Sequence, residues 1–362
     1  MEGAKRPASV FRKPPPPPTA TFIAPPAPPP PAPGAPPAAG GPPPVPPGGP
    51  ILHRPTFHGA GSTLFGIYVV NALLILATIG GYYFWAKTRV RRYLFSETAF
   101  AGDRFAYHGT GRELALGFLR AFLVFLCPLI GLGVVRDWPG IDANVKKVAA
   151  YLVSFLLLVF IPVAMVGARR YRLSRTSWRG IRFSFRGRVR DLVVIFFKSS
   201  ILAGLTFGLY YPFYLTQRQG FMISNSYFGS ERFGWDGRGR DLFRSFLLAV
   251  VLTLPTLGLC WVWFLAHKRR FFWQHTSFAG ARFRSTVTGG ALLGLYAVNV
   301  LLLVATLGIA WPWVRVRNIR FGLRYLTLEG PLDLERIRQQ AQFASATGEG
   351  LAGFLDTGFD LG

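Results

Sequence analysis

The sequence predicts an all-α membrane protein with about six transmembrane helices, built from tandem repeats of about 50 residues that short extended linkers join at the membrane surface. Three observations support this fold class. Hydrophobic residues make up 51% of the chain. Six apolar runs are each about as long as a helix that crosses a bilayer. The phrase Thr-x-Gly closes an apolar run at Thr206, Thr256 and Thr306, at intervals of 50 residues.

The chain divides into three predicted segments: a tail at 1–55, a repeat-built transmembrane domain at 56–330 and a short C-terminal tail at 331–362. Residues 1–55 hold 22 of the 29 prolines, mixed with alanine and glycine. This composition predicts disorder with polyproline II character. The proline clusters could dock on a protein partner with an aromatic-lined groove, but a flexible tether is the favoured interpretation.

The predicted spans share a length of about 20 residues or more, enough to cross roughly 30 Å of hydrocarbon. They are 64–85, 116–135, 148–168, 192–214, 242–265 and 291–313. A buried helix of a soluble protein would explain one such run but is a poor explanation for six. The two cysteines, Cys127 and Cys260, both lie inside apolar runs. Neither a disulfide framework nor a metal site is therefore indicated.

A second phrase, Arg-Phe, recurs in the linkers at Arg104, Arg182, Arg232 and Arg282, each with an aromatic residue four positions earlier. Small residues between the aromatic and the arginine predict a short strand, a turn and a second strand. We predict that these four arginines contact the headgroups of anionic lipids. A guanidinium can bind two phosphate oxygens while the neighbouring phenylalanine enters the interface. An intraprotein carboxylate such as Asp191 or Asp241 is the alternative partner.

The net charge of +25 would also suit a nucleic-acid-binding protein. The most basic linker, 169–190, carries nine arginines and no acidic residue. Because it follows an apolar run directly, lipid headgroups are its nearest anions, and we expect no nucleic-acid partner.

Membrane topology poses a conflict. If all six runs cross, successive linkers alternate sides, and the positive-inside rule then places linkers one, three and five in the cytoplasm. Basic residues are nevertheless abundant on both sets of linkers. Some runs could instead bend back at Thr-x-Gly, so the sequence leaves the orientation open.

These phrases also resemble those of a known family. The opening Phe57-His-Gly-Ala-Gly, the Thr-x-Gly-x-x-x-aromatic run ends, the Phe-x-Gly-x-Arg-Phe phrases and the closing 348–356 segment resemble the bacterial YjgN-like family of inner-membrane proteins. The resemblance covers about residue 55 to the C-terminus. It implies a multi-pass protein of the bacterial inner membrane whose activity is uncharacterised, and it supplies no catalytic residue. A further repeated phrase, Gly-x-x-x-x-Leu, leads into the apolar runs at Gly59, Gly109, Gly187 and Gly237, and the chain departs from it at Val287, which replaces the glycine.

No catalytic, metal-binding or cofactor-binding motif is present in the sequence, so we expect a protein that is not an enzyme and needs no cofactor. The favoured function is a membrane scaffold or lipid-associated protein. The alternative is a small-solute transporter or channel with a polar path near Asn71, Lys198 and Asn299, which lie inside predicted spans. Hydrogen bonds between helices are the simpler explanation of the two asparagines.

Overall fold

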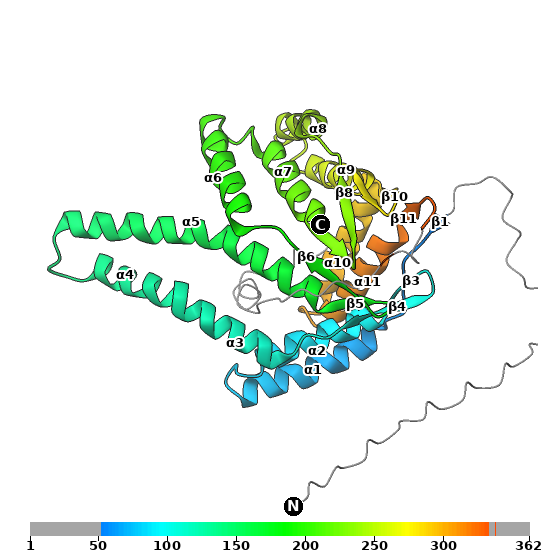
Figure 1. Cartoon of the computed structure of the whole chain (residues 1–362), viewed down its shortest axis with the longest axis horizontal. Helices are drawn as coiled ribbons and strands as arrows, with labels where there is room; N and C mark the ends of the chain where they lie inside the picture. Colours follow the sequence, from blue (N-terminus) through cyan, green and yellow to red (C-terminus); the bar gives the residue numbers. More distant parts are fainter. Residues whose placement is uncertain (1–51, 333–336, 338–362) are drawn as a thin grey trace, which may run out of the picture. The chain divides into compact units, whose positions relative to one another are not determined.

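The linkers between the apolar runs form one antiparallel sheet in the computed structural model, which describes residues 52–332 and residue 337 (Figure 1). The strands are β1 (Leu52–His53), β2 (Thr56–Phe57), β3 (Thr98–Phe100), β4 (Asp103–Tyr107), β5 (Thr176–Trp178), β6 (Ile181–Phe185), β7 (Ser226–Phe228), β8 (Glu231–Trp235), β9 (Thr276–Phe278), β10 (Ala281–Ser285) and β11 (Leu326–Glu329). Their order in the sheet is β1-β11-β10-β9-β8-β7-β6-β5-β4-β3-β2.

The sheet curls until one segment of the chain joins its two ends. β1 pairs with β11 and β2 pairs with β3, and only Arg54 and Pro55 separate β1 from β2. The N-terminal strand segment therefore links the first β-hairpin to the last strand. β1 and β2 thus pair with the outer sides of β11 and β3, whose backbone groups would otherwise be open to strands of other chains.

Tight turns make the curl possible. Between β3 and β4 the chain turns in two residues, Ala101 and Gly102, with φ of 48° and 87°. Two left-handed residues in a two-residue loop match the right-handed twist of the flanking strands. The β-hairpins expected from the sequence are thus present, but they pair with one another in one sheet instead of lying separately.

The register sends the two residues of each Arg-Phe phrase to opposite faces of the sheet. Phe105 pairs with Trp178, and Phe183 pairs with Phe228. Together with further strand aromatics these rings form one cluster, which also buries Ile337. The arginine of each phrase is exposed on the other face.

Helices fill the segments between the β-hairpins. They are α1 (Gly61–Ala77), α2 (Tyr83–Ser96), α3 (Gly111–Ala121), α4 (Cys127–Asp137), α5 (Ala143–Ser174), α6 (Val189–Leu205), α7 (Tyr211–Ser224), α8 (Gly239–Leu252), α9 (Cys260–Gln274), α10 (Gly289–Ala305) and α11 (Trp311–Arg324). A π-helical turn, Phe122–Leu126, joins α3 to α4. Neighbouring helices pack in chain order, and α11 packs against α1.

Four of the predicted spans are helical hairpins and not single helices. The four short hairpins, α1/α2, α6/α7, α8/α9 and α10/α11, each turn at Thr-x-Gly. At Thr206 the hydroxyl donates to Leu202 O at 2.7 Å and accepts from Tyr210 N at 3.0 Å. Phe207 and Gly208 are left-handed, and Gly208 N donates to Ala203 O at 2.7 Å. The threonine side chain and the glycine thus end one helix and begin the next within a few residues.

The remaining two spans form one long hairpin. The helical segment Gly111–Asp137 has 27 residues and Ala143–Ser174 has 32. At 1.5 Å per residue these are about 40 Å and 48 Å long, more than a hydrocarbon core requires. Within residues 52–332 these are the two helices long and apolar enough to cross a membrane. In Figure 1 the α4/α5 end of this hairpin extends well beyond the strands.

The predicted all-α fold with six crossing helices is therefore wrong. The linkers supply an 11-stranded sheet, and residues 52–332 contain two candidate crossing helices. The alternation of linkers that six crossing helices would require is absent from the described residues. Linkers one, three, four and five contribute strands to the same sheet, so they lie together. The proline-rich tail and most of the C-terminal tail lie outside the described residues.

Candidate membrane-binding site

The tips of the four short hairpins expose large apolar side chains. The middle residue of Thr-x-Gly is Ile79, Phe207, Leu257 or Leu307, and these side chains are 93–97% exposed. Each of the four also has φ near 50°. Left-handed backbone is unfavourable for residues other than glycine, asparagine and aspartate, above all for β-branched isoleucine. An apolar residue at such a position, pointing away from the protein, indicates an apolar environment at the tip.

Long uncharged stretches surround these tips. No Asp, Glu, Lys or Arg occurs in 71–86, 199–217, 245–266 or 289–314. Many further apolar side chains of the short hairpins are exposed, including Leu76, Leu205, Leu254 and Val304. An exposed apolar surface this continuous marks a contact with membrane or with another protein.

Aromatic rings and basic residues follow the tips on the second helix of each hairpin. Exposed tryptophans include Trp85, Trp263, Trp311 and Trp313. Lys87, Arg269 and Arg315 follow later on the same helices. Aromatic residues followed by bases are typical of the interface between hydrocarbon and headgroups.

Three of these tryptophans also lock neighbouring hairpins together. A Cβ on Gly61 would lie 2.4 Å from Trp313, one on Gly111 would lie 2.5 Å from Trp85, and one on Gly289 would lie 2.4 Å from Trp263. Each of these glycines lies three residues before the leucine that ends a Gly-x-x-x-x-Leu phrase or its variant at Val287, and the leucines at 64, 114, 192, 242 and 292 are fully buried. The phrase therefore serves packing between hairpins.

The tip of the long hairpin differs in chemistry. Residues 136–147 contain Arg136, Asp137, Asp142, Lys146 and Lys147. Asp142 caps α5 by accepting from Asn144 N at 2.8 Å, and Arg136 donates twice to Asp137. Charges at this density suit an aqueous surface.

A carboxylate fastens the base of the long hairpin. Glu113, in the first turn of α3, accepts from Arg175 Nη2 at 2.9 Å and from Tyr171 Oη at 3.0 Å. Asp236 has a similar place at the base of α8/α9, where it contacts His275 Nδ1 at 2.7 Å and accepts from Arg282 Nη2 at 2.8 Å. Sequence reasoning missed both groups, because their members are far apart in the chain.

The four predicted lipid-contacting arginines all lie exposed on the face of the sheet opposite the aromatic cluster. Arg282 is paired with Asp236, and Arg104 is 3.9 Å from Glu97. Arg232 donates to the carbonyl of Ser224. The adjacent phenylalanines are partly buried in the aromatic cluster on the opposite face of the sheet. The contact of the arginines with lipid stays a prediction.

The three predicted intramembrane polar residues do not meet. Asn71 donates to Ala86 O at 3.4 Å within the α1/α2 hairpin. Asn299 donates to Asn318 Oδ1 at 2.7 Å within α10/α11. Lys198 is exposed on α6. The two asparagines thus serve separate helix contacts, as the simpler explanation expected.

Within residues 52–332, no group of three His, Cys, Asp or Glu residues could hold a metal ion. The tips are therefore the strongest candidate site in the described part of the chain. Sequence reasoning overlooked them although the signal was present, since the middle residue of Thr-x-Gly is a large apolar one in all four copies.

Comparison with known proteins agrees with the membrane assignment. The chain is similar to Inner membrane protein YjgN of Escherichia coli K12, with 35% identity over 156 residues, which is 43% of this chain and 37% of the relative. The protein of the same name from Salmonella typhimurium is 31% identical over 139 residues, or 38% of this chain and 32% of the relative. The matches thus span well under half of each relative. No solved structure matches the chain significantly.

The names of these relatives confirm the predicted bacterial inner-membrane location and the resemblance to YjgN-like proteins. A family model described as "Bacterial protein of unknown function (DUF898)" matches residues 52–264 and 247–354. These matches cover most of the sequence, and the chain therefore belongs to the DUF898 family of bacterial proteins.

Proposed function

We propose that this chain is a non-enzymatic, lipid-associated scaffold of the inner membrane, in which the long hairpin crosses the bilayer and the four short hairpins enter it from one side without crossing. The observation that carries the proposal is the contrast between the tips. Four tips present exposed apolar residues on left-handed backbone, whereas the long hairpin ends in a charged loop.

Helix length supports the same division. The first helices of the short hairpins have 17 residues in α1, α6 and α10 and 14 in α8, or about 21–26 Å at 1.5 Å per residue. These helices are shorter than a hydrocarbon core of about 30 Å. The charge-free tips also hold nothing that would be stabilised by water on the far side.

The distribution of basic residues supports a cytoplasmic sheet. In this arrangement all the arginine-rich linkers lie on one side of the membrane, and the 136–147 loop lies on the other. The positive-inside rule then places the sheet in the cytoplasm without the conflict that six crossing helices create. The tandem repeats follow naturally as copies of one membrane-inserting unit.

Transport is less well supported, because its proposed polar residues occupy three separate environments. Non-enzymatic function is supported by the structural explanation of each repeated phrase: Thr-x-Gly forms tips, Gly-x-x-x-x-Leu packs hairpins, and Arg-Phe builds the sheet.

Cysteine labelling in spheroplasts tests this topology. In a Cys127→Ala/Cys260→Ser background, single cysteines are placed at Trp138, Arg232, Thr286 and Leu257. A membrane-impermeant maleimide should label Trp138→Cys in intact spheroplasts. Arg232→Cys and Thr286→Cys should both react only after permeabilisation, and Leu257→Cys should resist labelling until the protein is unfolded.

The pair at positions 232 and 286 is decisive, because six crossing helices would place linkers four and five on opposite sides. Labelling of one but not the other in intact spheroplasts contradicts the proposal. Ready labelling of Leu257→Cys from either side would mean that the tip lies in water.

A further inference from the structure

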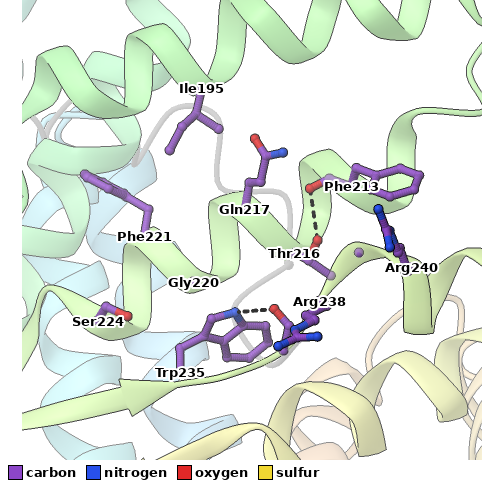
Figure 2. Close-up of a pocket in the computed structure, with 12 residues that line it drawn as sticks. Ile195, Phe213, Thr216, Gln217, Gly220, Phe221, Ser224, Trp235, Arg238 and Arg240 are labelled. Carbon is purple, nitrogen blue, oxygen red and sulfur yellow. Dashed lines mark hydrogen bonds between the residues drawn. The ribbon is translucent and has the colours of Figure 1, made fainter.

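A groove of about 720 Å³ opens beside α7, where the chain passes from β8 into α8 (Figure 2). Arg238 and Arg240 line it at the α8 end, whereas Ile195 and Phe221 lie at the other end in Figure 2. Trp235 closes it on the sheet side. Neither aspartate nor glutamate is among its lining residues. The groove therefore combines a cationic end with an apolar end.

In two equivalent places an arginine of the preceding helix reaches the corresponding loop. Arg170 Nη2 donates to Gly187 O at 2.8 Å, and Arg320 Nη2 donates to Gly59 O at 2.8 Å. Both guanidinium groups satisfy a carbonyl in the loop between a strand and the next hairpin.

In α7 the position equivalent to that arginine is occupied by Gly220. Gly220 lies 50 residues after Arg170, and Trp235 lies 50 residues after Phe185. A Cβ on Gly220 would be 2.7 Å from Trp235 Cδ1, so the indole occupies the path that an arginine side chain would take. The indole Nε1 donates to Gly237 O at 3.1 Å, and the loop carbonyl is thereby satisfied without a cation.

The guanidinium groups of Arg238 and Arg240, at the mouth of this groove, are available to bind an anion. Within residues 52–332, the side chains of Arg238 and Arg240 make no hydrogen bond or ion pair with the protein. The nearby carboxylate of Asp236 is engaged with His275 and Arg282. Two guanidinium groups without a carboxylate match the oxygens of a phosphodiester, to which each can donate two hydrogen bonds.

We infer that this groove binds one anionic phospholipid through its headgroup, with the phosphate between Arg238 and Arg240. The inference rests on the proposed function, because it requires the base of α8 to lie at headgroup depth. The 14 residues of α8 span about 21 Å from groove to tip. A leaflet of hydrocarbon is about half of 30 Å thick, so a tip within it leaves the groove among headgroups.

Binding of defined lipids to the purified full-length protein tests the inference. The probes are dihexanoyl phosphatidylglycerol, dihexanoyl phosphatidylcholine and inorganic phosphate, and the readout is the bound fraction by native mass spectrometry. The parent should bind one phosphatidylglycerol and prefer it to phosphatidylcholine. Arg238→Gln/Arg240→Gln should weaken phosphatidylglycerol binding at least about tenfold, because two charge-assisted contacts are lost.

Two variants taken from the neighbouring unit sharpen the test. Arg188→Gln/Arg190→Gln removes the equivalent arginines beside the site that Arg170 fills, and it should leave binding unchanged. Gly220→Arg/Trp235→Phe copies the Arg170 and Phe185 pair into the groove while keeping both arginines at its mouth. Because this pair already occurs in the fold, the variant should fold, and it should lose the bound lipid.

Equal losses in the 188/190 and 238/240 variants would mean a general charge effect and would overturn the inference. Equal competition by inorganic phosphate would assign the site to a free anion. Retained binding in Gly220→Arg/Trp235→Phe would place the lipid elsewhere. Labelling of Thr286→Cys and Leu257→Cys in the same variants reports separately on membrane topology, so failure of the groove and failure of the proposed function are distinguishable.

Discussion

The long hairpin and the four short hairpins leave the same sheet, yet they end in opposite chemistry. The long hairpin turns through Trp138–Asp142 beside five charged residues within 136–147. Each short hairpin turns through a threonine, an exposed apolar residue and a glycine, with no charged residue nearby. The difference indicates that the chemistry of the turn determines how deeply a helical hairpin extends into the bilayer. A charged loop must reach water, whereas an apolar turn can stay in hydrocarbon.

Length and tip chemistry agree in both kinds of hairpin. The helices with charged ends are long enough to cross, at 27 and 32 residues, and those with apolar ends are not. Two independent properties of the sequence thus give the same division. One sheet can then hold crossing and non-crossing hairpins side by side.

Charges placed at the tips test this comparison with the largest expected effect. Phe207→Asp/Leu257→Asp should destabilise the protein in lipid nanodiscs by about 6 kcal/mol, because a charge in hydrocarbon costs about 3 kcal/mol. Trp138→Asp/Ile141→Asp in the long hairpin should change stability by less than about 1 kcal/mol, as surface substitutions usually do. Thermal unfolding in nanodiscs measures both. Similar losses for the two pairs would remove the distinction between the tips.

The sequence contained a signal for the short helical hairpins that its hydrophobicity alone did not show. The apolar run 64–85 looks like a single span because its uncharged length exceeds 20 residues. Thr78 and Gly80 lie inside it, however, and threonine followed by a left-handed glycine is a signal for a helix end. Hydropathy averages over such a turn, and the span count was therefore wrong while the membrane assignment was correct.

The sheet was harder to predict, because its strands are short and their partners are remote. β4 has five residues, and it pairs with β5, which begins about 70 residues later. The local phrase predicts each β-hairpin but carries no information on which hairpins join. The groove beside α7 was visible only as Gly220 in a column of arginines at 170, 270 and 320, a difference that has no meaning without the packing of Trp235.

The four arginines on the sheet face opposite the aromatic cluster should give the next largest effect on stability. Replacing Arg104, Arg182, Arg232 and Arg282 by glutamine should lower the stabilisation that added anionic lipid gives, by up to about 4 kcal/mol at roughly 1 kcal/mol per residue. Arg104 precedes the long hairpin and the other three precede short ones. If the sheet meets one membrane face for both kinds of hairpin, Arg104→Gln alone should remove a share similar to that of each other single variant.

Melting temperatures with and without cardiolipin measure this effect. An unchanged cardiolipin benefit in the quadruple variant would contradict the lipid contact. Asp236 and Glu97, which Arg282 and Arg104 already approach, would then be the functional partners of these arginines.

The two carboxylates at the hairpin bases give the smallest effects. Glu113→Gln should cost about 1–2 kcal/mol, because it weakens the contacts of Arg175 and Tyr171, which are largely shielded from water. Asp236→Asn at the base of the short α8/α9 hairpin should cost less than about 1 kcal/mol at pH 7, since its ion pairs are half exposed. Thermal unfolding in detergent compares the two variants. A larger loss of stability in Asp236→Asn than in Glu113→Gln would contradict the expected order.

The loss at Asp236 should also depend on pH. Partial burial raises the pKa of Asp236, but the hydrogen bond with His275 and the charge of Arg282 outweigh it, so the pKa lies below its usual value. A carboxyl whose pKa is lower in the folded state stabilises the fold above its unfolded pKa of about 3.9. That contribution falls as the pH drops through the folded pKa. The stability difference between parent and Asp236→Asn should therefore be full at pH 6–7 and shrink as the pH drops below the unfolded pKa of about 3.9 and through the folded pKa. A difference that stays constant over this range would mean that asparagine disturbs packing, and that the charge of Asp236 does not hold the base of the short hairpin.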